Sequence, residues 1–100
     1  MAGLDPHIHQ PTRLRILMLL SGVDSADFSF LLNTLGLTKG NLSSHMGRLE
    51  EAGYVEVTKS FNGKVPNTAY SLTRSGRSSL EGYWRAIDGI RQGGAGSGDP

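Results

Sequence analysis

One stretch of the sequence combines hydrogen-bonding side chains with unusually small ones. From Thr38 to Arg48 the polar positions hold Thr, Lys, Asn, Ser, His and Arg, and two glycines are interspersed among them. In a helix, where successive residues are about 100° apart, Gly40, Ser44 and Gly47 fall on one side. A side with so little bulk lets another backbone approach closely, and Ser and Asn bond phosphates and base edges. These residue types at this spacing predict a surface that contacts nucleic acid.

The larger side chains of this stretch suit different contacts. Lys39 lies in the first turn of the expected helix, where the helix dipole also attracts a phosphate. Arg48 could read a guanine or pair with Glu51, and both alternatives stay open. His45 lies at the margin of the apolar side, where packing against the first helix is favoured over contact with DNA.

Solvation alone is the plainer explanation for Asn41, Ser43 and Ser44, because most exposed Ser and Asn residues contact only water. A solvated helix face more often carries Lys and Glu pairs, and this difference favours a surface that another backbone approaches closely. The residues predicted to bind DNA, on this helix and on the hairpin after it, are Thr38, Lys39, Gly40, Asn41, Ser43, Ser44, Arg48, Lys59, Lys64 and Asn67.

The sequence offers few candidate residues for disulfides, metal binding or catalysis. The chain of 100 residues has no cysteine, which excludes disulfides, thiolate nucleophiles and cysteine metal sites. His7 and His9, with Asp5 nearby, have a spacing that could bind a metal, but two histidines without a third defined ligand are weak evidence. The sequence shows neither a convergent nucleophile and base nor a phosphate-binding glycine loop. We therefore expect no enzymatic activity, no metal and no cofactor.

Charge is nearly balanced over the whole chain and uneven along it. The formal net charge is +1, yet between Lys39 and Arg77 there are six basic residues and three acidic ones. That local excess permits a basic surface. No apolar run approaches the roughly 20 residues that span a membrane, and the amino terminus lacks the pattern of a signal peptide. The expected location is the cytoplasm.

Capping signals define the helix that would position the polar stretch. Thr38 precedes a helix over residues 39–52, and Gly53 can take the left-handed conformation that ends it. Its apolar side, which would face a core, consists of Leu42, Met46 and Leu49.

Two further helices precede this one. Pro11 suits the first position of a helix, and the apolar run after it predicts a largely buried helix that ends at Gly22. Asp27 is placed to cap a short second helix that runs to Gly36. Only two or three residues then separate this helix from the cap at Thr38, and so tight a connection is typical of a helix-turn-helix.

Alternating apolar residues beyond the third helix predict a β-strand, and the dipeptide Asn62-Gly63 favours a hairpin turn after it. The return strand is expected over residues 68–73. Because Pro66 cannot donate a ladder hydrogen bond, we expect the hairpin tip, residues 61–67, to be a looser loop.

Thr73 is placed to cap a last helix, which runs to about Arg91 and carries a long apolar stripe. The amino-terminal segment could cover part of the stripe, and a second copy of the same helix could cover the rest. Tyr83 and Trp84 could instead line an effector pocket, although packing is the commoner role. The residues predicted at a dimer interface are Leu4, Ile8, Leu80, Tyr83, Trp84, Ile87 and Ile90. Residues 92–100 are rich in glycine and are expected to form a disordered tail.

Four segments, residues 9–17, 38–46, 48–55 and 71–77, carry a resemblance to a known group of proteins. They are similar to the compact winged-helix transcriptional regulators of the MarR/ArsR-like group, and the resemblance extends over residues 4–91. It implies an α+β fold, mainly α: a winged helix-turn-helix with a two-stranded β-hairpin wing and a C-terminal dimerisation helix. Residues 1–91 would form the DNA-binding domain with its terminal dimerisation segments. The chain departs from the group at the wing tip, where several arginines are usual.

The resemblance implies a homodimeric transcriptional regulator that binds double-stranded DNA with sequence specificity. The helix over residues 39–52 would lie in the major groove, and the wing tip, residues 61–67, would lie near the minor groove. The same fold could instead serve as a protein-interaction module without DNA binding. Binding of a small-molecule effector is compatible with membership of this group, and the sequence does not identify such a molecule.

Overall fold

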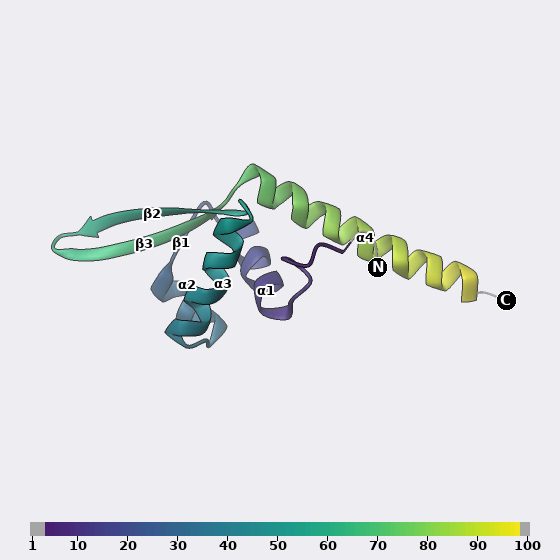
Figure 1. Ribbon diagram of the computed structural model, residues 1–100, viewed down its shortest axis with the longest axis horizontal. Helices are drawn as coiled ribbons and strands as arrows, with labels where there is room; N and C mark the ends of the chain where they lie inside the picture. Colours follow the sequence, from purple (N-terminus) through teal and green to yellow (C-terminus); the bar gives the residue numbers. More distant parts are fainter. Residues whose placement is uncertain (1–3, 99–100) are drawn as a thin grey trace.

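The computed structural model describes residues 4–98, with side chains up to Arg91. Its elements are α1 (Pro11–Ser21), β1 (Ala26–Asp27), α2 (Phe28–Leu35), α3 (Lys39–Glu51), β2 (Val55–Asn62), β3 (Val65–Leu72) and α4 (Arg74–Gly98). The hairpin of β2 and β3 is the wing. The wing and α4 extend in opposite directions from a body that contains α1, α2 and α3 (Figure 1). The predicted mainly helical, winged helix-turn-helix fold is confirmed.

Local capping signals explain where the helices begin. Asp27, Thr38 and Thr73 are the predicted N-caps, and the side-chain oxygen of each accepts a hydrogen bond from the N–H three residues later, at 2.7, 3.1 and 2.9 Å. Gln10 caps α1 in the same way at 2.7 Å. This cap escaped prediction, because Gln is not among the residue types that signal a helix start.

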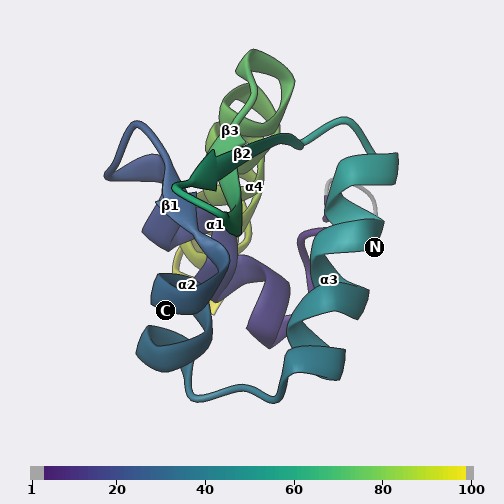
Figure 2. The same ribbon diagram turned by 90° about the vertical axis from the view of Figure 1, so that its left-hand side faces the viewer.

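The predicted helix-turn-helix is formed by α2 and α3. Gly36 has a φ of 68°, and its N–H donates to the carbonyl of Leu32 at 3.0 Å, so α2 ends in the left-handed conformation that favours glycine. Leu37 packs against the core within the short connection. Viewed from the wing tip, the hairpin projects toward the reader above α2 and α3 (Figure 2).

The sheet has three antiparallel strands in the order β1-β3-β2, one strand more than predicted. The additional strand, β1, was not predicted, although Asp27 was correctly expected to cap the next helix. This strand pairs with β3 only through Ala26 to Tyr70 and Asp27 to Ala69. Two residues are too few to show an alternating pattern, so this strand has no signal in the local sequence.

The wing tip is tighter than predicted. The ladder between β2 and β3 continues to the pair Asn62–Val65, so the turn contains only two residues. Gly63 supplies the positive φ, 67°, that such turns require. The expected loop over residues 61–67 and the expected start of the return strand at residue 68 are therefore wrong. Pro66 is tolerated because β1 does not reach this part of β3 and leaves its outer edge open.

One aliphatic cluster, to which every helix contributes, forms the core. The predicted core side of α3 is confirmed, since Leu42, Met46 and Leu49 are at most 1% exposed. Burial of α1 is less complete than predicted, because Met18 is 48% exposed. The remaining buried apolar residues are Ile8, Ile16, Leu17, Leu20, Ala26, Leu31, Leu35, Val55, Tyr70, Leu80 and Tyr83.

The last helix is longer than predicted. It runs to Gly98 instead of ending near Arg91, so residues 92–98 of the expected disordered tail are helical, and residues 99 and 100 lie outside the described residues. Once a helix has nucleated, each further residue adds a hydrogen bond without a new nucleus. Although α4 is long, no helix in the described part of the chain has the apolar length that crossing a membrane requires.

The residues predicted at a dimer interface differ in burial. Ile8, Leu80 and Tyr83 are no more than 6% exposed, so the core of the same chain already covers them. Trp84 and Ile90 are 38% and 40% exposed. The other two, Leu4 and Ile87, are partly buried against the core. Only the outer part of the stripe is therefore free to meet another subunit.

Candidate nucleic-acid interface

The exposed side of α3 carries the predicted polar residues. Burial of Leu42, Met46 and Leu49 fixes the rotation of the helix and turns the positions between them outward. Lys39 lies in the first turn, where free N–H groups and the helix dipole attract an anion. The predicted DNA-binding residues on α3 and its cap are all exposed: Thr38, Lys39, Gly40, Asn41, Ser43, Ser44 and Arg48.

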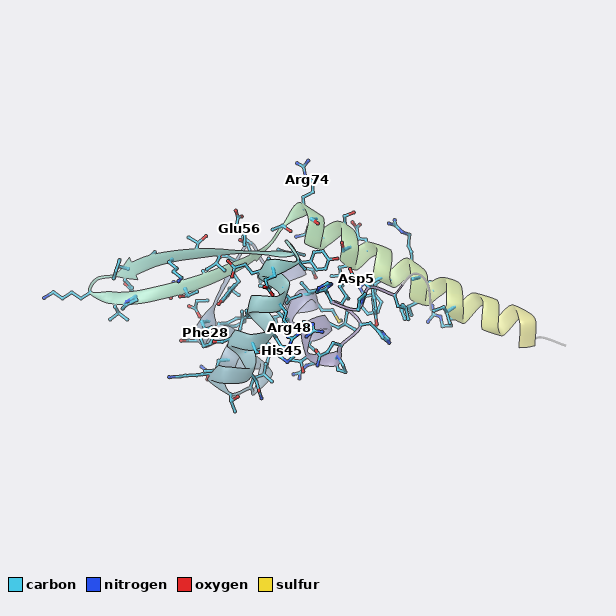
Figure 3. The ribbon with its side chains drawn as sticks, viewed as in Figure 1. Asp5, Phe28, His45, Arg48, Glu56 and Arg74 are labelled. Atoms are coloured by element: carbon cyan, nitrogen blue, oxygen red, sulfur yellow. The ribbon has the colours of Figure 1, made fainter. Side chains whose placement is uncertain are left out.

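The carboxyl-terminal half of α3 forms a shallow depression. Its lining residues are Ser43, Ser44, Gly47, Arg48, Glu50 and Glu51. Two carboxylates therefore border a surface that is otherwise small and basic. Among the described side chains, Arg48 forms no ion pair with Glu51, so the guanidinium is available to an outside acceptor. Arg48 and His45 lie on the same part of α3 (Figure 3).

A second depression joins the wing to the helix-turn-helix. Its lining residues are Phe28, Ser43, Glu50, Val57, Lys59, Thr68 and Tyr70. The structure thus brings Ser43 of α3 and Lys59 of β2, both predicted to bind DNA, to the borders of one hollow. Burial and the negative charge of Glu50 raise the pKa of Tyr70, so its hydroxyl stays protonated.

Phe28 is a candidate contact residue that the sequence did not reveal. It is the first residue of α2, is half-buried, and lies beneath the wing (Figure 3). Its helical spacing with the leucines of α2 indicates a core position, and the side chain does pack partly against the core. Its place at the second depression depends on the wing, which is distant in sequence, and no local signal could have shown it.

The two faces of the wing carry different predicted residues. Lys59 pairs with Thr68, and Ser60 pairs with Asn67. Because alternate residues of a strand point to opposite faces, Lys59 lies on the inner face, toward α3, and Asn67 lies on the outer face. Lys64 is exposed in the turn at the tip. The structure therefore brings Lys59 next to α3 but does not bring Asn67 there.

Arg13 connects α1, α3 and the amino-terminal segment. Its Nε donates a hydrogen bond to the carbonyl of His7 at 2.7 Å, and its NH1 lies 3.3 Å from Nδ1 of His45. The predicted packing of His45 against the first helix is confirmed by this contact. Burial and the positive charges of Arg13 and Arg48 lower the pKa of His45. The neutral imidazole therefore adds no charge to α3 at neutral pH.

Asp5 fastens the amino-terminal segment to the connection between α3 and β2. Its carboxylate accepts hydrogen bonds from the hydroxyl of Tyr54 and from the N–H of His7, the latter at 2.9 Å. Burial opposes ionisation, but these bonds and the nearby His7 ring lower the pKa of Asp5 overall. His9 instead has its Nδ1 2.9 Å from the hydroxyl of Tyr83. His7 and His9 thus have different partners and do not converge as metal ligands would.

A small apolar groove lies between the amino-terminal segment and α4. Its lining residues are His9, Gln10, Pro11, Leu14 and Tyr83. Trp84 does not border this groove, and its ring packs edge-on against Tyr83 with the centroids 5.5 Å apart. Of the two aromatic residues that could line an effector pocket, only Tyr83 borders this groove.

Comparisons with known sequences agree with this geometry. Residues 12–90 match the family model described as a winged helix DNA-binding domain. The chain is also 42% identical over 72 residues to uncharacterized protein MJ0432 of Methanocaldococcus jannaschii, a match that covers 71% of this chain and 77% of that protein.

Solved structures show the same fold. A transcriptional regulator homologue from Pyrococcus horikoshii OT3 superposes with a TM-score of 0.81 at 30% identity, covering 87% of this chain and 86% of the other. Rv0081 of M. tuberculosis superposes with a TM-score of 0.69 at 27% identity, covering 87% of this chain and 83% of the other. The predicted resemblance to winged-helix transcriptional regulators is confirmed.

Proposed function

The chain belongs to the winged helix DNA-binding domain family, and we propose that it is a homodimeric transcriptional regulator that binds duplex DNA with sequence specificity. The observation that carries this proposal is the hollow shared by α3 and the wing, which Ser43 and Lys59 border from two sides. In the proposed complex, α3 lies in the major groove and the wing tip lies near the adjacent minor groove.

The glycines of α3 support this placement. The 13 residues of α3 give a rod of about 20 Å, which a major groove accepts. A Cβ added at Gly40 or Gly47 would meet nothing within 4 Å, so the fold itself does not require either glycine. Each glycine nevertheless lowers helix stability by about 0.5–1 kcal/mol relative to alanine. Close approach of a DNA backbone to α3 explains why small residues occur there.

Four basic side chains are proposed to contact phosphates. Lys39 and Arg48 extend from the exposed side of α3, Lys59 extends from the inner face of the wing, and Lys64 lies at the tip. Each phosphate neutralised on B-DNA releases counterions and steepens the dependence of binding on salt by about 0.9 in the log–log slope. Because these cations are few, we expect the affinity to depend only modestly on salt concentration. Hydrogen bonds from the small polar side chains of α3 would then supply the sequence specificity.

The homodimer is proposed to form through the outer part of α4. This helix projects away from the body (Figure 1), and it exposes Trp84 and Ile90 along that course. Pairing of two such helices would remove these side chains from water and place two recognition helices on half-sites about one helical turn apart. The proposed role also places the protein in the cytoplasm, where its operator would be.

The decisive experiment is duplex binding over a salt series. The probe is a pool of duplexes with a randomised centre, enriched by selection on the wild-type protein. Ser44→Glu puts a carboxylate in the middle of the exposed side of α3, and we expect it to weaken binding at least about tenfold. Ser78→Glu adds the same charge at an exposed position of α4, and we expect it to bind like wild type.

The outcomes separate the two functions that the sequence left open. If the wild-type protein retains no duplex even at low salt, the proposal fails and a protein-interaction module becomes the better explanation. If the duplex binds Ser44→Glu and wild type equally, DNA binding stands but α3 does not enter the groove.

A further inference from the structure

The wing tip exposes apolar side chains that its own chain does not cover. Phe61 is 74% exposed and Val65 is 66% exposed, more than any other large apolar side chain in the described part of the protein. A phenylalanine in water at the end of a hairpin gains nothing from the fold of the monomer. Apolar side chains grouped at an exposed tip favour contact with a partner surface.

The strand register places Phe61 on the inner face of the wing. Phe61 pairs with Pro66, and Lys59 pairs with Thr68 two residues nearer the body. Since side chains alternate along a strand, these four residues share one face, and Lys59 and Thr68 line the hollow between the wing and α3. The apolar pair at the tip thus continues the surface that is proposed to hold DNA.

Charge at the tip favours a polyanion. Lys59 and Lys64 lie on either side of Phe61 in the sequence, and no Asp or Glu occurs from residue 57 to residue 73. A second copy of the wing is a poor partner, because packing two tips together would bring four ammonium groups near one another, and residues 57–73 contain no carboxylate to offset them. Duplex DNA offers phosphates to the lysines and apolar sugar walls to the ring.

The hairpin is also rigid enough to place Phe61 in a minor groove. The ladder between β2 and β3 runs through eight residue pairs and closes in a two-residue turn, so Phe61 is held on a continuous ribbon. Apolar side chains, Phe and Pro among them, can enter a minor groove and partly unstack a base step, which bends the duplex. Pyrimidine–purine steps open most easily.

We propose that Phe61 and Pro66 form a minor-groove wedge, which opens a base step beside the site held by α3 and bends the operator. This inference rests on the proposed DNA binding and adds a source of specificity that no hydrogen bond supplies. The wedge makes the protein prefer a TA or CA/TG step at the place where the tip enters.

The test uses the duplex selected on wild-type protein, with fluorescent dyes at its two ends to report bending and 2-aminopurine at the flanking step to report unstacking. Phe61→Ala should lose the bend and the rise in 2-aminopurine fluorescence, weaken binding about tenfold, and leave the salt slope unchanged because no charge is removed. Phe61→Leu should keep most of the bend, since leucine can also serve as a wedge. Val65→Ala changes a side chain that is also largely exposed but lies on the outer face, so it is the matched control and should behave like wild type.

Failure of the wedge can be told apart from failure of DNA binding. A wild-type protein that binds no duplex defeats the underlying proposal. A wild-type protein that binds duplex without bending it, or a Phe61→Ala protein that still bends it, overturns the wedge alone. An equal loss of bending in Val65→Ala would also overturn it, because the bend would then not depend on the inner face of the wing.

Discussion

The backbone of Gly76 packs directly on the carbonyl of Tyr54. A Cβ added at Gly76 would lie 2.1 Å from that carbonyl oxygen and 2.8 Å from Cδ1 of Leu72, so no other residue fits without a shift of the backbone. Around the same point, the N–H of Thr73 donates to the Tyr54 carbonyl at 3.0 Å, and the Thr73 hydroxyl donates to the Gly53 carbonyl at 2.6 Å. This joint sets the start of α4 against the end of α3.

Gly76→Ala is therefore expected to destabilise the protein by about 1–3 kcal/mol, because the methyl group overlaps backbone atoms that cannot rotate away. Urea unfolding followed by circular dichroism measures the change. Gly82→Ala is the control on the same helix, since a Cβ there meets nothing within 4 Å. It should stabilise α4 by about 0.5–1 kcal/mol. Equal effects of the two substitutions would contradict the proposed close approach.

Lysines of the wing should contribute separately to the salt dependence of DNA binding. Lys59→Ala and Lys64→Ala are each expected to reduce the log–log salt slope by about 0.9, because each removes one phosphate contact. Arg74→Ala is the matched control, since Arg74 extends from the start of α4 away from α3 (Figure 3). Titrations by fluorescence anisotropy at several salt concentrations give the slopes. A change for Arg74→Ala as large as for the lysines would mean that the contact surface is wrongly placed.

Removal of one acid should strengthen DNA binding. Glu50 borders both depressions of the interface, where its carboxylate would repel phosphates. We expect Glu50→Gln to tighten duplex binding several-fold at low salt, with the gain shrinking as salt screens the repulsion. Glu56→Gln removes the same charge from a side chain that points away from α3 (Figure 3) and should change affinity much less. Weaker binding by Glu50→Gln would show that the carboxylate accepts a hydrogen bond from the DNA.

Protonation of His45 should destabilise the fold. Burial, Arg13 and Arg48 lower its pKa from the ordinary value of 6.5, so the folded state binds this proton less readily than the unfolded state does. The corresponding stability is present above pH 6.5 and is lost as the pH falls through the lowered pKa. Urea unfolding between about pH 7 and about pH 5 should therefore show a smaller decline for His45→Gln than for wild type. If the free energy of unfolding falls equally in His45→Gln and wild type, protonation of His45 does not cause the loss of stability.

The dimer proposal predicts which substitutions yield monomers. Trp84→Lys and Ile90→Lys place charges on the exposed part of the α4 stripe and should shift sedimentation from dimer to monomer while the circular dichroism spectrum is kept. Val23→Lys changes a side chain of similar exposure, 40%, between α1 and β1, and should stay dimeric. If both α4 variants sediment as dimers, α4 does not form the interface.

Much of the helical framework could be predicted because its signals are local. Asp27, Thr38 and Thr73 bond to N–H groups only three residues away, so their roles follow from neighbouring sequence alone. The exposed side of α3 was predictable for the same reason, since the rotation of a helix follows from the spacing of its buried residues.

Features that depend on distant pairing escaped prediction. The strand β1 forms because it pairs with Ala69 and Tyr70, which are far away in the sequence. A strand of two residues is too short to show an alternating pattern of apolar and polar residues. Pro66 suggested a loose tip because the open edge beside it was not known. The requirement for glycine at Gly76 likewise arises from a carbonyl on another segment, and the sequence shows only one glycine among many.

Beyond the two residues held by β1, the wing is a bare ribbon with both edges unpaired. A two-stranded hairpin without further strands at its edges is narrow enough to enter a groove. Its unpaired backbone N–H and C=O groups, beside the exposed Phe61 and Val65, can however also pair with strands of other molecules. Pro66 removes one backbone donor from such an edge, and Lys64 places a charge at its end. The proline that argued against a regular hairpin thus disfavours pairing of the wing with strands of other molecules.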